Sequence, residues 1–135
     1  MALRFTNTEK WKDPWFSDLN KEEKILFLYL QDNVDNSGIY EISFKRLHFE
    51  LDFSEAEILG AIKGLARGLV GVKEGLKTCD KIYLKNFLKY QKNLPLNPFN
   101  SYHLSAIKAF AENYEFICEH PFIANLPVVG IKKNR

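Results

Sequence analysis

Residues 53–69, "FSEAEILGAIKGLARGL", combine three glycines with two cations in a pattern suited to close contact with a polyanion. Gly60, Gly64 and Gly68 recur every four residues, and Lys63 and Arg67 lie between them. Each glycine inside a helix costs roughly 1 kcal/mol relative to alanine, so a stripe of glycines needs a physical reason. Small residues let a helix backbone approach a neighbour closely, and the two cations can bind phosphate oxygens.

The partner of such a stripe can be duplex DNA or another helix. As the third helix of a helix-turn-helix, this segment would enter the major groove and bring Gly60 and Gly64 against the DNA. Alternatively, the two glycines would seat another helix of this chain or of a second subunit. Gly68 alone is expected to be the helix C-cap, whichever partner the other two glycines contact. Glu55 and Glu57 lie in the turn that usually reads base edges, where acids repel phosphate. The sequence therefore favours contacts with the DNA backbone over sequence-specific readout.

Further cations extend the candidate interface beyond one helix. The net charge is +2, but residues 1–67 hold 9 Lys and Arg against 12 Asp and Glu, whereas residues 68–135 hold 10 against 5. Six lysines fall within residues 73–92, a local excess that attracts polyanions and that also suits an ordinary solvated edge. The predicted DNA contacts are Lys45, Arg46, Gly60, Lys63, Gly64, Arg67, Lys73 and Lys77.

No group of residues in the sequence has the spacing of a catalytic or metal site. His48, His103 and His120 are isolated, and "GAIKGLARG" lacks the Gly-Lys-Ser/Thr ending of a phosphate-binding loop. Cys79 and Cys118 match no metal-ligand or redox spacing and are expected to be reduced thiols. We therefore expect a protein that is not an enzyme and needs no cofactor or metal.

Predicted helix caps place the elements that carry these residues. Asn20 begins a helix with Glu23 as its capping-box partner, and the dense apolar run that follows predicts a central buried helix. Ser43 caps a second helix over residues 44–51, and Ser54 caps the helix that carries the glycines. The apolar residues expected on the core face of that third helix are Ile58, Ile62, Leu65 and Leu69.

Strand patterns complete the predicted fold. Residues 38–43, "GIYEIS", read as a short strand with Ile39 and Ile42 nearest the core. After Gly68 the apolar period changes from helical to two, which predicts a hairpin with Ile82 and Leu84 inward and Lys81, Tyr83 and Lys85 outward. The order helix, strand, helix, helix, hairpin is that of a winged helix-turn-helix, a mostly α fold with a small β-hairpin (α+β class).

The ends of the chain add an arm and a further helix. The aromatic segment "KWKDPWFSDL" predicts an N-terminal arm anchored in the core by Trp11, Trp15 and Phe16. We expect a winged-helix domain with this arm over residues 1–92, a proline-containing linker over 93–100, and a C-terminal helix with a basic tail over 101–135. The helix should span about 101–116, with an apolar stripe of Ile107, Phe110, Tyr114 and Ile117. No apolar run has the length of a membrane span, and a cytoplasmic protein is expected.

Several segments together resemble the N-terminal winged-helix domain of phage and prophage replication proteins. They are "FTNTEKWKDPWFSDLNKEEKILFLYLQDN", "SGIYEISFKRLHFEL", and "IYLKNFLKYQ" followed by "LNP". The resemblance spans roughly residues 5–98 and is to the replisome-organiser or replication-initiator type, related in role to DnaD-like primosomal proteins. The chain departs from it in the turn "LDFS", where relatives often have glycine, and in the glycine-rich third helix.

The resemblance implies binding of replication-start DNA in a bacterial host cell, and recruitment of replisome proteins such as a helicase or its loader. The expected partner is double-stranded DNA, and a homo-oligomer is compatible with the pattern. Two other functions fit the same predicted fold. One is a winged-helix module for protein–protein interaction in replisome assembly, and the other is a transcription regulator.

Overall fold

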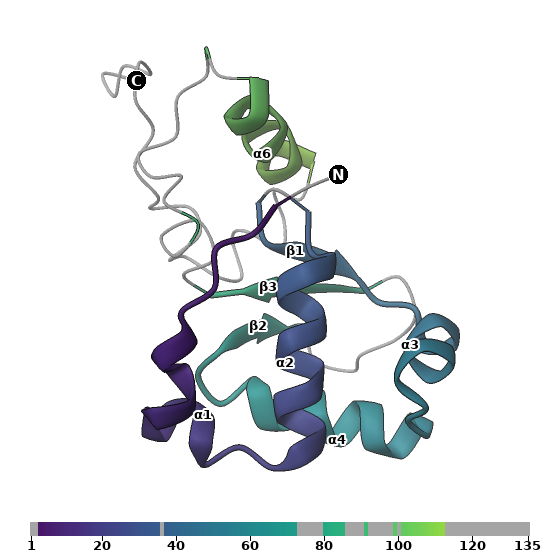
Figure 1. The fold of residues 1–135 in the computed structure, drawn as a ribbon. Coiled ribbons are helices and arrows are strands. Elements are labelled where there is room, and N and C mark those ends of the chain that lie inside the picture. Colours follow the sequence, from purple (N-terminus) through teal and green to yellow (C-terminus); the bar gives the residue numbers. More distant parts are fainter. Residues whose placement is uncertain are drawn as a thin grey trace.

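The structure is a computed structural model that describes residues 3–35, 37–72, 80–85, 91, 99 and 101–112. In chain order its elements are η1 (Thr8–Lys12, a 3-10 helix), α1 (Pro14–Ser17), α2 (Lys21–Asn33), β1 (Ile39–Glu41), α3 (Phe44–Leu51), α4 (Glu55–Leu65), β2 (Val70–Val72), β3 (Lys81–Leu84) and α6 (Ser101–Glu112). In Figure 1, α2 stands in front of the sheet, α4 lies below, α3 lies to one side and α6 lies above β1.

The strands form an antiparallel sheet in the order β1–β3–β2. Tyr40 lies opposite Ile82, and Gly71 lies opposite Tyr83. The strand predicted at residues 38–43 therefore joins the predicted hairpin in one sheet of three described strands, a pairing that the sequence analysis did not predict. A mostly helical chain with a small antiparallel sheet is the α+β class that the sequence predicts.

The predicted helix starts are confirmed by their caps. In α2 the Asn20 side chain accepts a hydrogen bond from Glu23 N (2.8 Å), and Glu23 Oε1 accepts one from Asn20 N (2.9 Å). The same reciprocal pair begins α4, where Ser54 Oγ accepts from Glu57 N (3.1 Å) and Glu57 Oε1 accepts from Ser54 N (2.9 Å). Ser43 caps α3 as predicted. These bonds satisfy backbone donors that have no partner inside the helix.

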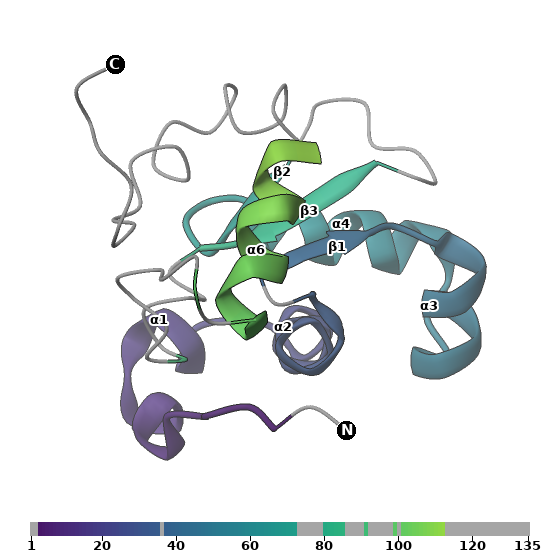
Figure 2. The same ribbon diagram turned by 90° about the horizontal axis from the view of Figure 1, so that it is seen from above.

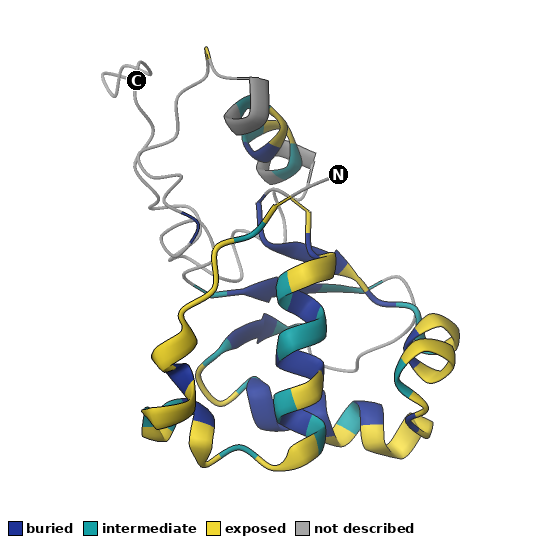
Figure 3. Ribbon diagram, in the orientation of Figure 1, coloured by how far each residue is buried: buried dark blue, intermediate teal, exposed yellow. Residues whose placement is uncertain are grey.

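The core lies between α2, α4 and the sheet (Figure 3). Its fully buried side chains include Leu26, Leu30, Ile58, Ile62, Leu65 and Ile82, so the predicted core face of α4 is confirmed. The predicted central helix, α2, supplies Leu26, Phe27 and Leu30 to this core, and the sheet and α4 cover one side of it. Ile25, on the other side, is 42% exposed.

The end of α4 differs from its predicted position. The helix ends at Leu65, and its capping residue is Ala66 with φ −66°. Gly68 is therefore not the C-cap, and the glycine that needs a left-handed backbone in the described ranges is Gly38 (φ 91°). The last carbonyls of α4 are satisfied by tight turns, in which Arg67 N donates to Gly64 O and Gly68 N donates to Leu65 O, both at 3.3 Å. Such turns need no residue with positive φ.

Both faces of the sheet are covered, which the alternating pattern did not predict. Tyr83, expected to face solvent, is 1% exposed, and its register partner Ile39 on the same face is 4% exposed. Figures 1 and 2 place α6 beyond the β1 edge, where Ala106 is buried against the core. Alternation predicts a solvent face only where one side of a sheet is open, and this sheet has no such side at Tyr83.

The predicted aromatic arm packs on the core through two of its three expected anchors. Phe16 is fully buried and Trp15 is partly buried against the core, but Trp11 is 56% exposed. Trp11 meets Phe16 edge to face, with ring centroids 4.7 Å apart, and so covers the outside of the anchor. The arm is also held at Phe5, whose N–H and C=O both bond the side chain of Gln91, at 2.6 and 2.7 Å.

The C-terminal predictions are tested only in part. α6 begins at Ser101 as predicted and is described to Glu112, and its Ile107 packs against the core. Most of the predicted linker, the Phe110 side chain, and residues 113–135 with Tyr114 and Ile117 lie outside the described residues. Within the described ranges, the helices all fall short of the length and apolar character that a bilayer crossing needs.

Candidate nucleic-acid interface

The outer side of α4 carries a stripe of small and cationic residues. Ala56, Gly60, Lys63 and Arg67 are all exposed, and their spacing of four, three and four residues aligns them along one side of a helix. Ala66 has helical φ and ψ (−66°, −10°), so the chain continues in the same direction to Arg67 beyond the last helical residue. We call these four residues the α4 stripe.

Gly60 leaves open space at the centre of the α4 stripe. A Cβ atom built on it would meet no atom within 4 Å, so no neighbour inside the described fold requires a glycine there. The absence of a side chain instead exposes helix backbone between Ala56 and Lys63. A partner could approach the helix axis more closely here than at any larger residue.

Gly64 does not belong to this surface, and the prediction that it faces DNA beside Gly60 is wrong. It is buried where α4 packs on α2, and a Cβ on it would lie 1.5 Å from Glu23 Oε2. Glu23 is itself 9% exposed, and its carboxylate accepts a hydrogen bond from Asn20 N, which holds the carboxylate in that position. Gly64 therefore permits contact with a helix of the same chain, the other interpretation that the glycine pattern allowed.

Two acidic residues, Glu55 and Glu57, lie in the first turn of α4, and one of them has a structural role there. The Glu57 carboxylate accepts from Ser54 N, and this bond holds the pKa of Glu57 below its usual range. Its position is therefore explained by the capping box. Glu55 is exposed in the same turn and makes no such bond among the described residues. Both acids still place negative charge at the end of α4 away from Lys63 and Arg67.

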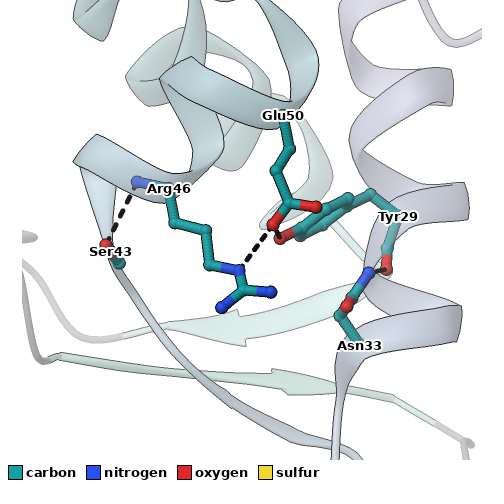
Figure 4. A network of polar contacts seen from close by, with 5 residues as sticks. All are labelled: Tyr29, Asn33, Ser43, Arg46 and Glu50. Atoms are coloured by element: carbon teal, nitrogen blue, oxygen red, sulfur yellow. Dashed lines mark hydrogen bonds and ion pairs between the residues drawn. The ribbon is translucent and has the colours of Figure 1, made fainter.

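On α3 the two predicted cations differ. Arg46 Nε donates to Glu50 Oε1, which also accepts from the Tyr29 hydroxyl at 3.0 Å (Figure 4). These hydrogen bonds raise the pKa of Arg46 and lower the pKa of Glu50, although both groups are exposed. Lys45 is exposed and has no ion-pair partner in the described part of the chain. The four-residue spacing of Arg46 and Glu50 could have predicted their pairing.

The two cations predicted to contact DNA from the wing stay a prediction. Lys73 and Lys77 lie outside the described residues. Lys81, from the same lysine-rich segment, pairs with Glu41 across β1 and β3 at 3.1 Å. The lysines of this segment therefore cannot all be counted as free positive charge.

One prominent exposed residue is missing from the sequence prediction. Phe49 is 85% exposed on the side of α3 opposite the buried Leu47. Its position in "FKRLHFEL" placed it away from Phe44, Leu47 and Leu51, so the helical period could have identified it. An exposed aromatic ring of this kind can anchor a protein partner.

In the described ranges, His, Cys, Asp and Glu side chains form no cluster of three that could hold a metal ion. Comparisons with models of known families, with curated proteins and with solved structures find no match to this chain. The arrangement of α4, its exposed stripe and the neighbouring cations is therefore the basis for a functional proposal.

Proposed function

We propose that this chain is a non-catalytic winged-helix protein that binds duplex DNA through α4 and the wing. The α4 stripe carries the proposal, because it joins an exposed, side-chain-free patch at Gly60 to Lys63 and Arg67 on the third helix of the core. The order of the elements and the sheet order β1–β3–β2 support the winged-helix assignment. Phage or prophage replication initiation is the proposed setting, and it rests on the sequence resemblance alone.

The charge distribution favours binding to the phosphate backbone. Lys63 lies in the last turn of α4 and Arg67 lies just beyond its end, whereas Glu55 and Glu57 occupy the first turn. A duplex that meets this surface would place phosphates near the two cations and away from the acids. Such contacts give affinity with little dependence on base sequence and a steep dependence on salt.

Fluorescence anisotropy with a labelled duplex at about 50 and about 200 mM salt tests the proposal. Four neutralised phosphates would give a log–log slope near −3.6 and therefore about a hundredfold loss over this range. The double variant Lys63→Glu/Arg67→Glu should lose affinity at least tenfold and flatten the slope by about 2.

The matched control reverses two cations that lie away from α4. Lys12→Glu/Lys108→Glu makes the same change in net charge, on η1 and α6. It should reduce affinity much less and leave the slope unchanged. Equal losses in the two variants would make the binding a net-charge effect, and no duplex binding at the lower salt would refute the proposal.

A protein-interaction module is the second candidate, favoured by the 85% exposed Phe49. In that case Phe49→Ala would abolish capture of a replisome protein, such as a helicase or its loader, while Lys63→Glu/Arg67→Glu would not. A transcription regulator on the same fold would show the same salt dependence as the first candidate. It would differ in binding an operator sequence more tightly than a generic duplex.

A further inference from the structure

The outer face of α2 carries two apolar side chains that the described fold covers only in part. Lys21, Ile25, Leu28 and Asp32 are spaced by four, three and four residues and so form one stripe along the helix. Ile25 is 42% exposed, Leu28 is partly buried, and Lys21 and Asp32 at the two ends are exposed. Figures 1 and 3 show α2 in front of the sheet, with no described helix or strand in front of α2 itself.

The charges at the ends of the stripe oppose the helix dipole. Lys21 is the first residue of α2, where the dipole favours an acid, and Asp32 is in the last turn, where it favours a base. Other residues of the first turn follow the rule, since Glu22 and Glu23 are acidic. The helix dipole therefore gives no reason for the cation and the anion at these two ends.

We infer that the α2 stripe is a self-association surface that binds the same stripe of a second copy in antiparallel orientation. Reversal of the helix places Lys21 opposite Asp32 of the second copy, and Asp32 opposite its Lys21. The centre of the contact is then Ile25 against Leu28 of the second copy, twice over. A twofold interface requires such self-complementarity, in which each contact occurs in both directions.

The charge pattern is what favours a second copy as the occupant. The stripe has a cation at one end, an anion at the other and two apolar residues between them. Two copies of it place opposite charges together only when the second helix runs antiparallel to the first. Within one chain, the charge of Lys21 contributes to the low pKa of Glu57. Burial lowers the pKa of Lys10, and the charge of Asp32 partly offsets that lowering. Neither Lys21 nor Asp32 has an ion pair in the described ranges.

Two apolar side chains per copy make a small interface, so the dimer should be weak. We expect a dissociation constant on the order of 100 µM at low salt, far from that of an obligate dimer. The inference does not depend on DNA binding. Because α4 packs on the inner side of α2, the α4 stripe stays free in the dimer.

Sedimentation velocity of the full chain from about 10 to about 500 µM, at about 50 mM salt, tests the inference. The average mass should rise with concentration in the unaltered protein. Ile25→Glu should abolish the rise, whereas the control Phe99→Glu, which places an equal charge at an exposed apolar residue elsewhere, should not. Circular dichroism establishes that each variant is folded.

A charge swap tests the antiparallel register. Lys21→Glu and Asp32→Lys should each weaken the dimer about tenfold, because two attractive pairs become repulsive. The double variant Lys21→Glu/Asp32→Lys should restore it. Both single changes suit the helix dipole, so a loss of dimer without a loss of thermal stability excludes unfolding as the cause.

Three results would overturn the inference. The first is a monomer at every concentration, and the second is a dimer that Ile25→Glu leaves intact. The third is a dimer that neither single charge change weakens, which is the result for a parallel pair, where Lys21 would face Lys21 and a change of sign leaves the repulsion as it was.

Discussion

Gly64→Ala tests the contact between α4 and α2, because the structure gives a sharp geometric reason for this glycine. A Cβ on Gly64 would lie 1.5 Å from Glu23 Oε2 and 2.5 Å from its Cδ. The carboxyl group must move, although Glu23 is only 9% exposed and its other carboxylate oxygen accepts a hydrogen bond from Asn20 N at 2.9 Å. The substitution therefore costs either the capping bond or a shift of α4 away from α2.

The magnitude follows from opposing contributions. Alanine in place of glycine stabilises a helix by up to about 1 kcal/mol. Loss of the capping interaction costs about 1 kcal/mol, and overpacking in a closed site costs about 1–3 kcal/mol. We expect Gly64→Ala to lower the free energy of unfolding by about 1–2 kcal/mol. Gly60→Ala, which meets no atom within 4 Å, should raise it by about 0.5–1 kcal/mol.

Urea denaturation followed by circular dichroism measures these changes, and a double-mutant cycle identifies their cause. In a Glu23→Ala background the clash is absent, so Gly64→Ala should become stabilising by about 1 kcal/mol. The coupling energy between the two sites would then be about 2–3 kcal/mol. If Gly64→Ala stabilises the unaltered chain as much as Gly60→Ala does, the account of Gly64 as an internal contact is refuted.

The remaining predictions concern the cap, the open stripe and alkaline stability. Ser54→Ala should destabilise the chain by about 1 kcal/mol in urea denaturation, because α4 loses a reciprocal capping box. Gly60→Leu should leave stability unchanged or higher but weaken duplex binding about tenfold in anisotropy, because a side chain would hold α4 away from the DNA. Burial raises the pKa of Tyr83 to about 12, so between pH 10 and 12 the unfolded chain releases a proton that the folded chain keeps, and the free energy of unfolding should fall. Burial also raises the pKa of Tyr40, which lowers the free energy of unfolding at alkaline pH in the same way. Burial lowers the pKa of Lys10, which has the opposite effect. Tyr83→Phe should therefore reduce the loss of stability that denaturation measures at pH 11.

Local signals predicted much of the helical framework. Asn20, Ser43 and Ser54 were identifiable as caps, because capping depends on residues within one turn of each other. The end of α4 was not identifiable in the same way. Continued apolar spacing to Leu69 extended the predicted helix, but the chain turns after Leu65 and enters β2 at Val70. Leu69 still packs against the core, so the apolar residue was correct and its secondary structure was not.

Features that depend on distant parts of the chain could not be read from the sequence. Tyr83 follows an alternating pattern, and only coverage of the second face of the sheet buries it. Gly64 lies in the same repeat as Gly60, yet it meets Glu23 from a helix some forty residues earlier, whereas Gly60 meets nothing. A periodic pattern gives the side of a helix on which a residue lies, but the packing of helices decides which glycine is buried.

The separation of Gly60 from Gly64 narrows what α4 can do as a binding helix. With both glycines exposed, the helix would offer a long bare surface that could lie deep in a groove. With Gly64 buried, the open part is one residue long and is followed by Lys63 and Arg67 at the basic end. The first turn, which in a helix-turn-helix reaches the base edges, carries Glu55 and a Glu57 that is committed to its cap. An α4 built in this way would be positioned on DNA by phosphates, so any sequence preference would come from the wing or from DNA shape.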